Sequence, residues 1–513
     1  MPSVPVPSAA DLLQRLIRLD TVNPPGNERP AIELLAGLLE AAGFAVEQDG
    51  RTPERPNLVA ELAAEDPDAR AAGPVLGLLS HVDTVLASPE DWRHDPWSGH
   101  LDEDGVIWGR GAIDMKSQTA AEVTAAVGLA ASGWRPSRGS LKVIVVSDEE
   151  TGGADGAVWL CRERPDLARC DLLLNEGAGA PIHFRDRHHY GVCVGEKGPM
   201  RFVLRTHGRA AHASTPRLGD NALVRLAPLI TRLAEARLPV DLHPAIAALL
   251  DGLGLGSDDP EQAYATLRSE APELAAAIEP MGRVTVSPTR ISASDKINVI
   301  PDRAELRVDC RVPPGLEPQD VLGRIVTALG GDPARVERVA AGGGVGAGAG
   351  GGNGAGTAGA GGGAGAGAGV GAGTTAATGA RPQEATGPLG PGSVLLLPGE
   401  MLDLDGDVEL ELSEIVPGSA SPIAGPLMDA LHEWVGREAP TAQIVPTLLP
   451  GFTDSRAWRS TFPDCVAYGF FPHRTIDLRE QAGLMHAADE RIAVEDLDLA
   501  AACYRNVVVR LLG

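Results

Sequence analysis

Three short apolar stretches of this chain each end in side chains that can bind a metal ion. The stretches, with the side chains that follow them, are 75–79 with His81 and Asp83, 141–146 with Asp148, Glu149 and Glu150, and 171–174 with Asn175 and Glu176. An alanine-rich helical stretch, residues 117–131, separates the first two. Strands that alternate with helices indicate an α/β fold with a mostly parallel central sheet flanked by helices. Ligands bind beyond the carboxyl ends of the strands in such a sheet, so the three sets of side chains can converge on one site.

Within these sets, the spacing of the side chains suits a metal site. His81 and Asp83 lie two residues apart, so on an extended strand end both side chains face the same side. The carboxylate can then hold one imidazole nitrogen while the other nitrogen faces a metal. Glu149 and Glu150 are adjacent and cannot both point the same way from a strand end. One can bind metal while the other accepts a proton from water, although an isolated pair would be a solvated acidic turn.

The alternation of polar and apolar residues predicts a second domain from Gly198 onward. Residues 201–205 and 304–311 alternate as half-exposed strands do, and helical stretches occupy about 220–235 and 317–329, which favours a small α+β sandwich. A further candidate ligand, His486, lies near the C-terminus, so we expect the second domain to be inserted into the first. The predicted division is a catalytic domain over 1–197 and 417–513, with the second domain over 198–416.

A long uncharged segment of Gly and Ala interrupts the second domain. It has too few large apolar side chains to offset the cost of ordering a backbone, about 1–2 kcal/mol per residue. We therefore predict a disordered insert over about 341–390, with a Gly-Ala repeat stacked into sheets as the alternative. Gly and Ala also transfer poorly into hydrocarbon, so this segment should not span a membrane.

Composition excludes several classes of partner. With 44 Lys+Arg against 69 Asp+Glu, the formal charge of -25 repels nucleic acid and anionic membranes. The six cysteines are scattered without a C-x-x-C pair, as expected for reduced thiols in a cytosolic protein. The N-terminus has three prolines and neither a basic nor an apolar region of a secretory signal. These features together predict a cytoplasmic protein that binds neither nucleic acid nor membranes.

Five motifs stand in a defined order along the chain: SHVDTV (80–85), GRGAIDMK (109–116), SDEETGG (147–153), NEG (175–177) and LMHA (484–487). In these motifs the chain resembles the M20 clan of co-catalytic zinc peptidases and amidohydrolases. That clan includes aminoacylases, acetylornithine and succinyl-diaminopimelate deacylases, and glutamate carboxypeptidases. The resemblance spans nearly the whole chain apart from the Gly/Ala segment, and it implies a zinc-peptidase-like catalytic domain with an inserted lid and dimerisation domain.

The resemblance also implies a role for each residue of the site. Asp114 would bridge two zinc ions, His81 and Glu176 would be the further ligands of one ion, and Glu150 and His486 those of the other. Glu149 would be the general base, and Asp83 would orient His81. The peptide bond after Asp114 would be cis. Two histidines and three carboxylates suit Zn²⁺, two ions per subunit, although Co²⁺ or Mn²⁺ would also fit.

Three further residues resemble substrate contacts of the same clan. His212 lies in THGRAAHAS (206–214), the lid motif whose histidine reaches the active site of the partner subunit, which implies a homodimer through the lid. Without the resemblance, His212 would be a surface histidine. Asn298 in KINVIP (296–301) would contact substrate from the lid, or else form a turn. Arg456 in GFTDSR (451–456) could clamp a substrate carboxylate, although Phe452 stands where a small residue is common.

The implied function is hydrolysis of an amide bond through a water that bridges two zinc ions, with Glu149 as the base. The substrate would be an N-acyl amino acid, or a C-terminal peptide or dipeptide, and the sequence does not choose between them. One alternative is a non-catalytic binding protein that retains the fold, which predicts a missing ligand or base. Another is a dinuclear hydrolase of an ester or phosphoester, which would normally carry more histidine ligands.

Overall fold

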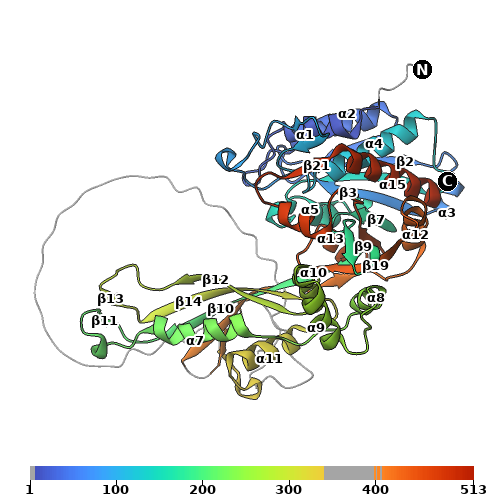
Figure 1. Cartoon of the computed structure of the whole chain (residues 1–513). Coiled ribbons are helices and arrows are strands. Elements are labelled where there is room, and N and C mark those ends of the chain that lie inside the picture. Colours follow the sequence, from blue (N-terminus) through green and yellow to red (C-terminus); the bar gives the residue numbers. More distant parts are fainter. Residues whose placement is uncertain (1–5, 340–397, 400, 405–406) are drawn as a thin grey trace, which may run out of the picture.

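The computed structural model describes residues 6–339, 398–399, 401–404 and 407–513. The predicted insert over about 341–390 lies outside the described residues. The described chain forms two bodies, each built on its own large sheet (Figure 1). Among these residues, no helix is both long and apolar enough to cross a membrane.

The first body, called here the main domain, contains a ten-stranded mixed sheet. Its parallel centre runs in the order β6 (Ser140–Val146), β3 (Val75–His81), β7 (Leu172–Asn175), β20 (Val466–Gly469). Antiparallel neighbours flank this centre: β2 (Asn57–Ala63) and β1 (Ala45–Asp49) on one side, and β9 (Arg187–Glu196) on the other. Three further strands pair with β9: β8 (Pro181–Phe184), β18 (Ser419–Ala420) and β19 (Ala442–Leu449). The α/β class is confirmed, and the predicted mostly parallel sheet is mixed, with parallel pairs at its centre and between β9 and β19.

Alternating side chains of the central strands enter two different cores. On β6, Leu141, Val143 and Val145 belong to the larger core, whereas Ile144 and Val146 belong to the smaller one. The larger core is covered by α1 (Ala9–Ile17), α2 (Arg29–Ala41), α4 (Lys116–Ala131), α12 (Pro426–Glu438) and α15 (Val494–Leu512). The smaller core is covered by α5 (Ala157–Glu163), α6 (Pro165–Ala168) and α13 (Ser455–Thr461). Helices on both faces explain why the central strands are continuous apolar runs.

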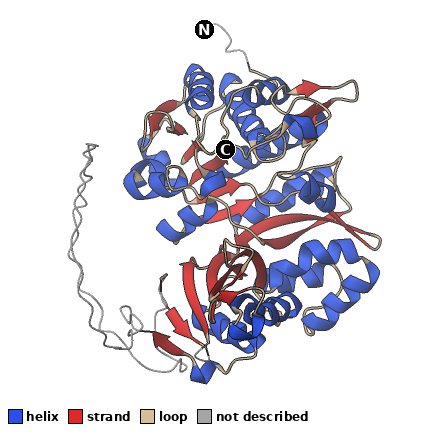
Figure 2. Cartoon of the chain, turned by 90° about the vertical axis from the view of Figure 1, so that its left-hand side faces the viewer, coloured by secondary structure: helices blue, strands red, loops and turns tan. Residues whose placement is uncertain are grey.

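The second body, called here the second domain, is a two-layer structure. Its antiparallel sheet has the order β12 (Thr285–Ser292), β14 (Arg303–Val312), β10 (Gly198–His207), β17 (Val408–Ile415), β16 (Met401–Asp403), β15 (Glu337–Val339). Helices α7 (Ala222–Glu235) and α11 (Pro318–Leu329) pack on one side of it (Figures 1 and 2). Buried and exposed residues alternate along β14, as expected for a strand covered on one face.

Residues 244–278 lie within the range predicted for the second domain but pack with the main sheet. They form α8 (Pro244–Gly252), α9 (Pro260–Glu270) and α10 (Pro272–Ile278), whose buried side chains belong to the core of the main domain. Amphipathic spacing marks a helix but does not say which sheet it covers. The remaining described elements are short: α3 (Pro67–Ala72), β4 (His100–Leu101), β5 (Val106–Trp108), β11 (Ala211–His212), β13 (Val299–Ile300), α14 (Leu478–Leu484) and β21 (Arg491–Ala493).

Candidate functional site

The candidate ligands meet at the carboxyl ends of the parallel strands. His81 ends β3, Glu149 and Glu150 form a 3-10 turn just after β6, and Glu176 follows β7 directly. Together with Asp114 and His486 they form two groups: His81, Glu149 and Glu176 in one, and Asp114, Glu150 and His486 in the other. Within each group the ligand atoms lie within 4.8 Å of one another. Adjacent Glu149 and Glu150 therefore point into different groups.

Asp114, a member of the second group, also contacts the first group. Its Oδ1 is 3.2 Å from Nε2 of His81, and its Oδ2 is 3.0 Å from Nε2 of His486. Nε2 of His486 is also 3.3 Å from Oε2 of Glu150. One carboxylate oxygen faces each group, which is the arrangement a bridging ligand requires. The Asp114–Met115 peptide bond is cis.

Asp83 belongs to neither group but contacts residues of both. Its Oδ1 lies 3.3 Å from Nδ1 of His81. The same carboxylate accepts hydrogen bonds from the backbone N–H groups of Glu149, at 3.2 Å, and Glu150, at 3.1 Å. Asn23 donates to it as well, at 2.8 Å. Asp83 thus fixes both the imidazole and the turn that carries the two glutamates, a positioning role at a metal centre.

Glu490 holds the backbone of Asp114 in a similar way. It is fully buried, and its Oε1 accepts from the N–H groups of Ile113, at 2.6 Å, and Asp114, at 3.0 Å. Its other oxygen accepts from Nη1 of Arg110 at 2.6 Å, and Nη2 of Arg110 reaches the carbonyl oxygen of His486 at 3.2 Å. The Arg110–Glu490 pair therefore connects the loop of Asp114 to that of His486.

The electrostatics of the two groups fit cation binding. Burial, reinforced by Glu176, raises the pKa of Glu149 well above its usual value. Burial alone would lower the pKa of His81, but its hydrogen bonds to Asp114 and Asp83 raise it well above the usual range. Oε1 of Glu150 is buried and has no hydrogen-bond partner. Crowded carboxylates with an orphaned oxygen, together with two imidazoles, are a donor set that suits Zn²⁺.

Comparison with known proteins identifies the family. A model of peptidase family M20/M25/M40 matches residues 77–510. The chain belongs to this family. The family resemblance of the five motifs, all of which lie within this range, is thereby confirmed.

Curated relatives of this M20 chain include two bacterial enzymes named succinyl-diaminopimelate desuccinylase. The one from Xanthobacter autotrophicus is 36% identical over 236 residues, 44% of this chain and 57% of that protein. The one from Paracoccus denitrificans is 34% identical over 239 residues, 46% of this chain and 58% of that protein. The match thus covers little more than half the length of these relatives.

Solved structures of other proteins are similar in fold to this M20 chain. An M20 family metallo-carboxypeptidase from Sulfolobus solfataricus matches with a TM-score of 0.61 at 15% identity, covering 99% of each chain. Human carnosine dipeptidase 1 matches with a TM-score of 0.61 at 13% identity, covering 98% of this chain and 96% of that one. At such identities the likeness concerns the fold alone.

The loop of residues 450–456, called here the Arg456 loop, lies beside the turn that carries Glu149 and Glu150. Nη2 of Arg456 donates to the carbonyl oxygen of Gly152 at 2.7 Å, and its guanidinium lies 3.9 Å from the centre of the Phe452 ring. Asp454 is buried, its Oδ2 has no hydrogen-bond partner, and burial raises its pKa to about 7. Gly153 has a φ of 69°, and a Cβ there would lie only 2.8 Å from Oδ1 of Asp454. The glycine therefore permits the close approach of this carboxylate.

His212 and Asn298 lie together but away from the ligands of their own chain. His212 pairs with Val299 between β11 and β13, and the N–H of Ala213 donates to the carbonyl oxygen of Asn298 at 2.9 Å. Both residues are exposed. Figure 1 places β11 and β13 at the end of the second domain remote from the main domain.

The motifs did not point to Asn23, Glu490 or Asp454. Glu490 lies four residues after the candidate ligand His486. Asp454 lies within the GFTDSR motif, two residues before Arg456. Their burial is the property that marks them, and sequence spacing does not report it.

Proposed function

We propose that this chain hydrolyses an amide bond in a small substrate, using two metal ions and Glu149 as the general base. The observation that carries the proposal is the placement of Asp114 between two ligand groups, with one oxygen facing each. Membership of a peptidase family supports the reaction class. Asp114 would be shared, His81 and Glu176 would complete one ion's protein ligands, and Glu150 and His486 would complete the other's. Zn²⁺ is the expected metal, and Co²⁺ or Mn²⁺ would also suit the donors.

When bound, such ions polarise a substrate carbonyl and lower the pKa of water to about 7. Sharing Asp114 gives each ion three protein ligands, so one carboxylate, Glu149, is left over. Its N–H is fixed by Asp83, and its side chain reaches within 4.0 Å of Nε2 of His81. From this position Glu149 would take the proton of the attacking water and pass it to the leaving nitrogen.

The proposed substrate carries a free carboxylate next to the scissile amide, as an N-acyl amino acid, a C-terminal peptide or a dipeptide does. Arg456 supports this class, because its guanidinium is held beside the turn of Glu149 and Glu150. A guanidinium has five N–H donors, so the bond to Gly152 leaves others for a carboxylate.

A homodimer would bring His212 to the site, where a donor would stabilise the developing oxyanion and Asn298 would contact substrate. Support comes from the remote position of β11 within one chain (Figure 1) and from exposed apolar side chains on the second domain, including Leu218, Val224 and Ile297.

A substrate panel tests the proposed function. The protein is stripped with a chelator, reloaded with Zn²⁺ or Co²⁺, and assayed on N-acetyl and N-succinyl amino acids, dipeptides and a chromogenic phosphate ester. We expect chelator-sensitive hydrolysis of at least one amide and none of the ester. Hydrolysis of the ester alone, or no turnover by the metal-loaded protein, would refute amide hydrolysis.

A further inference from the structure

We propose that Glu196, buried where the chain crosses between the two domains, is a positioning residue that holds the Arg456 loop beside the candidate metal centre. The effect of Glu196 on catalysis rests on the proposed function, whereas its effect on the position of the loop does not. No motif pointed to this residue.

Two of the crossings between the domains in the described chain pass Glu196. The chain leaves the main domain between β9, which ends at Glu196, and β10, which begins at Gly198. It returns through residues 416–420, and Ser419 pairs with Glu196 in the antiparallel ladder of β18 and β9. A Cβ on Gly198 would lie 1.9 Å from the carbonyl oxygen of Val416. The two crossings are therefore packed backbone against backbone.

The Glu196 carboxylate joins three segments at this point. It is 2% exposed, so these contacts are shielded from water. One oxygen accepts from Nη1 of Arg459, on α13, at 2.5 Å and from Oγ of Ser419, on the returning strand, at 3.3 Å. The other accepts from both the backbone N–H and the Oγ1 of Thr453, at 2.6 and 2.9 Å. Hydrogen bonds to an ionised carboxylate are roughly twice as strong as bonds between neutral groups.

From Thr453 the Arg456 loop continues to two of the strand ends that carry ligands. Oγ of Ser455 accepts from Nδ2 of Asn175, the residue before Glu176, at 3.0 Å. Arg456 reaches the carbonyl oxygen of Gly152, two residues after Glu150, at 2.7 Å. Glu196 is thus connected through one loop to the segments that present both Glu150 and Glu176.

The neighbouring Lys197 connects the same crossing to β12 of the second domain. Its Nζ is buried and donates to the carbonyl oxygen of Pro280 at 2.9 Å and to Oγ1 of Thr285, the first residue of β12, at 3.0 Å. Successive side chains of an extended strand point to opposite sides, so Glu196 and Lys197 reach opposite ways from one crossing. The position of the Arg456 loop is thereby tied to the segment that joins the domains.

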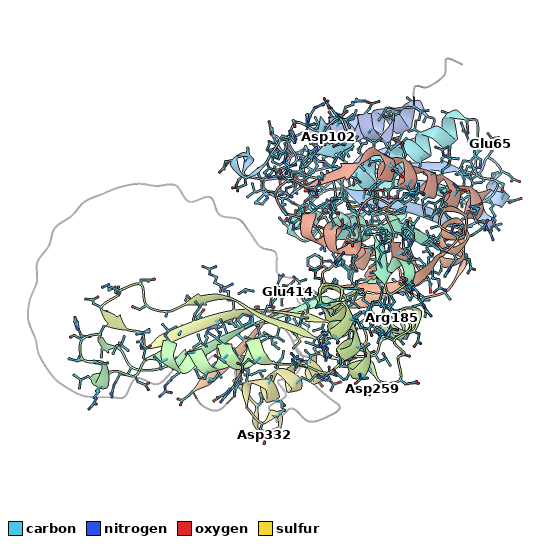
Figure 3. All side chains as sticks on the ribbon, viewed as in Figure 1. Glu65, Asp102, Arg185, Asp259, Asp332 and Glu414 are labelled. Carbon is cyan, nitrogen blue, oxygen red and sulfur yellow. The ribbon has the colours of Figure 1, made fainter. Side chains whose placement is uncertain are left out.

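The test compares Glu196→Gln with Glu414→Gln as a matched control. Glu414, labelled in Figure 3 near the junction of the two domains, also pairs with an arginine, Arg201, at 2.7 Å, but this pair joins β17 to β10 within the second domain. Thr453→Val is a second variant that keeps the Glu196–Arg459 ion pair and removes one donor to Glu196. Hydrogen–deuterium exchange with mass spectrometry follows the backbone of residues 450–456, and steady-state kinetics use the amide that the panel identifies.

We expect faster exchange in residues 450–456 for Glu196→Gln and Thr453→Val, with the core strands of both sheets unchanged, and no change for Glu414→Gln. In the same two variants kcat/KM should fall, on the order of ten- to hundredfold for Glu196→Gln, with bound metal retained. Unchanged exchange in the Arg456 loop of the folded variants would overturn the proposal, as would a uniform rise across both domains. If Glu196→Gln does not fold, Thr453→Val decides. Failure of the substrate panel would leave the exchange result, and hence this inference, standing on its own.

Discussion

The carboxylates around the candidate centre differ in what holds them. Asp114 is shared between two imidazoles, whereas Asp83 is occupied by His81 and two backbone N–H groups. Glu490 is occupied by Arg110 and two further N–H groups. A carboxylate whose lone pairs are already satisfied is a poor metal ligand, so the hydrogen bonds themselves separate ligands from positioning residues.

Glu490→Ala should weaken metal binding although Glu490 is no ligand. The change leaves the N–H of Asp114 without its acceptor and Arg110 without its carboxylate, so the bridging position loosens. We expect a rise in the metal dissociation constant on the order of 10–100-fold. Competition with a chromophoric chelator measures it. Glu480→Ala, which removes an exposed ion pair with Arg491, is the control, and equal affinities in the two folded variants would contradict the role of Glu490.

The sequence predicted the site at the scale of strand ends, together with the positioning residue Asp83, and missed the supports Glu490 and Asn23. His81, Glu149 and Glu176 follow apolar runs, and that position alone suggests convergence. Glu490 gives no such signal. It accepts a hydrogen bond from the N–H of Asp114, which lies 376 positions earlier in the chain. Asn23 likewise lies 60 positions before Asp83. In sequence, each is an ordinary polar residue of a loop.

At the scale of elements, the pattern of apolar residues predicted the central strands, but not which strands and helices pack beside them. The runs at 75–79 and 141–146 are indeed adjacent parallel strands. The antiparallel pairs beside the centre of the main sheet, and the packing of α8 to α10 on its core, depend on tertiary contacts that no local pattern encodes. At the interdomain crossing beside Gly198, two chain segments pack backbone against backbone.

A matched pair of glycine substitutions tests that packing. Gly198→Ala should destabilise the protein by about 1–3 kcal/mol or more, because the new Cβ would overlap the carbonyl oxygen of Val416. Gly436→Ala, at an exposed position of helix α12 with nothing within 4 Å of the new Cβ, should instead stabilise by about 0.4–1 kcal/mol. Urea unfolding of both variants checks the signs. A Gly198→Ala protein as stable as wild type would contradict the close packing of the crossings.

At the scale of the whole molecule, the question is which chain supplies His212. We expect Glu149→Gln and His212→Ala each to be poorly active, the latter by about 10²–10³ in rate. If His212 acts across a two-fold dimer, a heterodimer of the two variants has one complete site and about half of the wild-type activity. Co-expression with two affinity tags isolates that heterodimer. A heterodimer as inactive as its parents, or a fully active monomer on sizing chromatography, would contradict action in trans.

The central claim is that Glu149 moves a proton while the other acids hold metal. Its most direct test is the Glu149→Gln variant, in which elemental analysis counts bound metal and steady-state kinetics follow the amide substrate. The change keeps the shape of the side chain and removes its basicity, so both ions should remain while turnover falls by about 10²–10⁴ or more. Near wild-type turnover with both ions bound, or loss of an ion from the variant, would contradict the assignment.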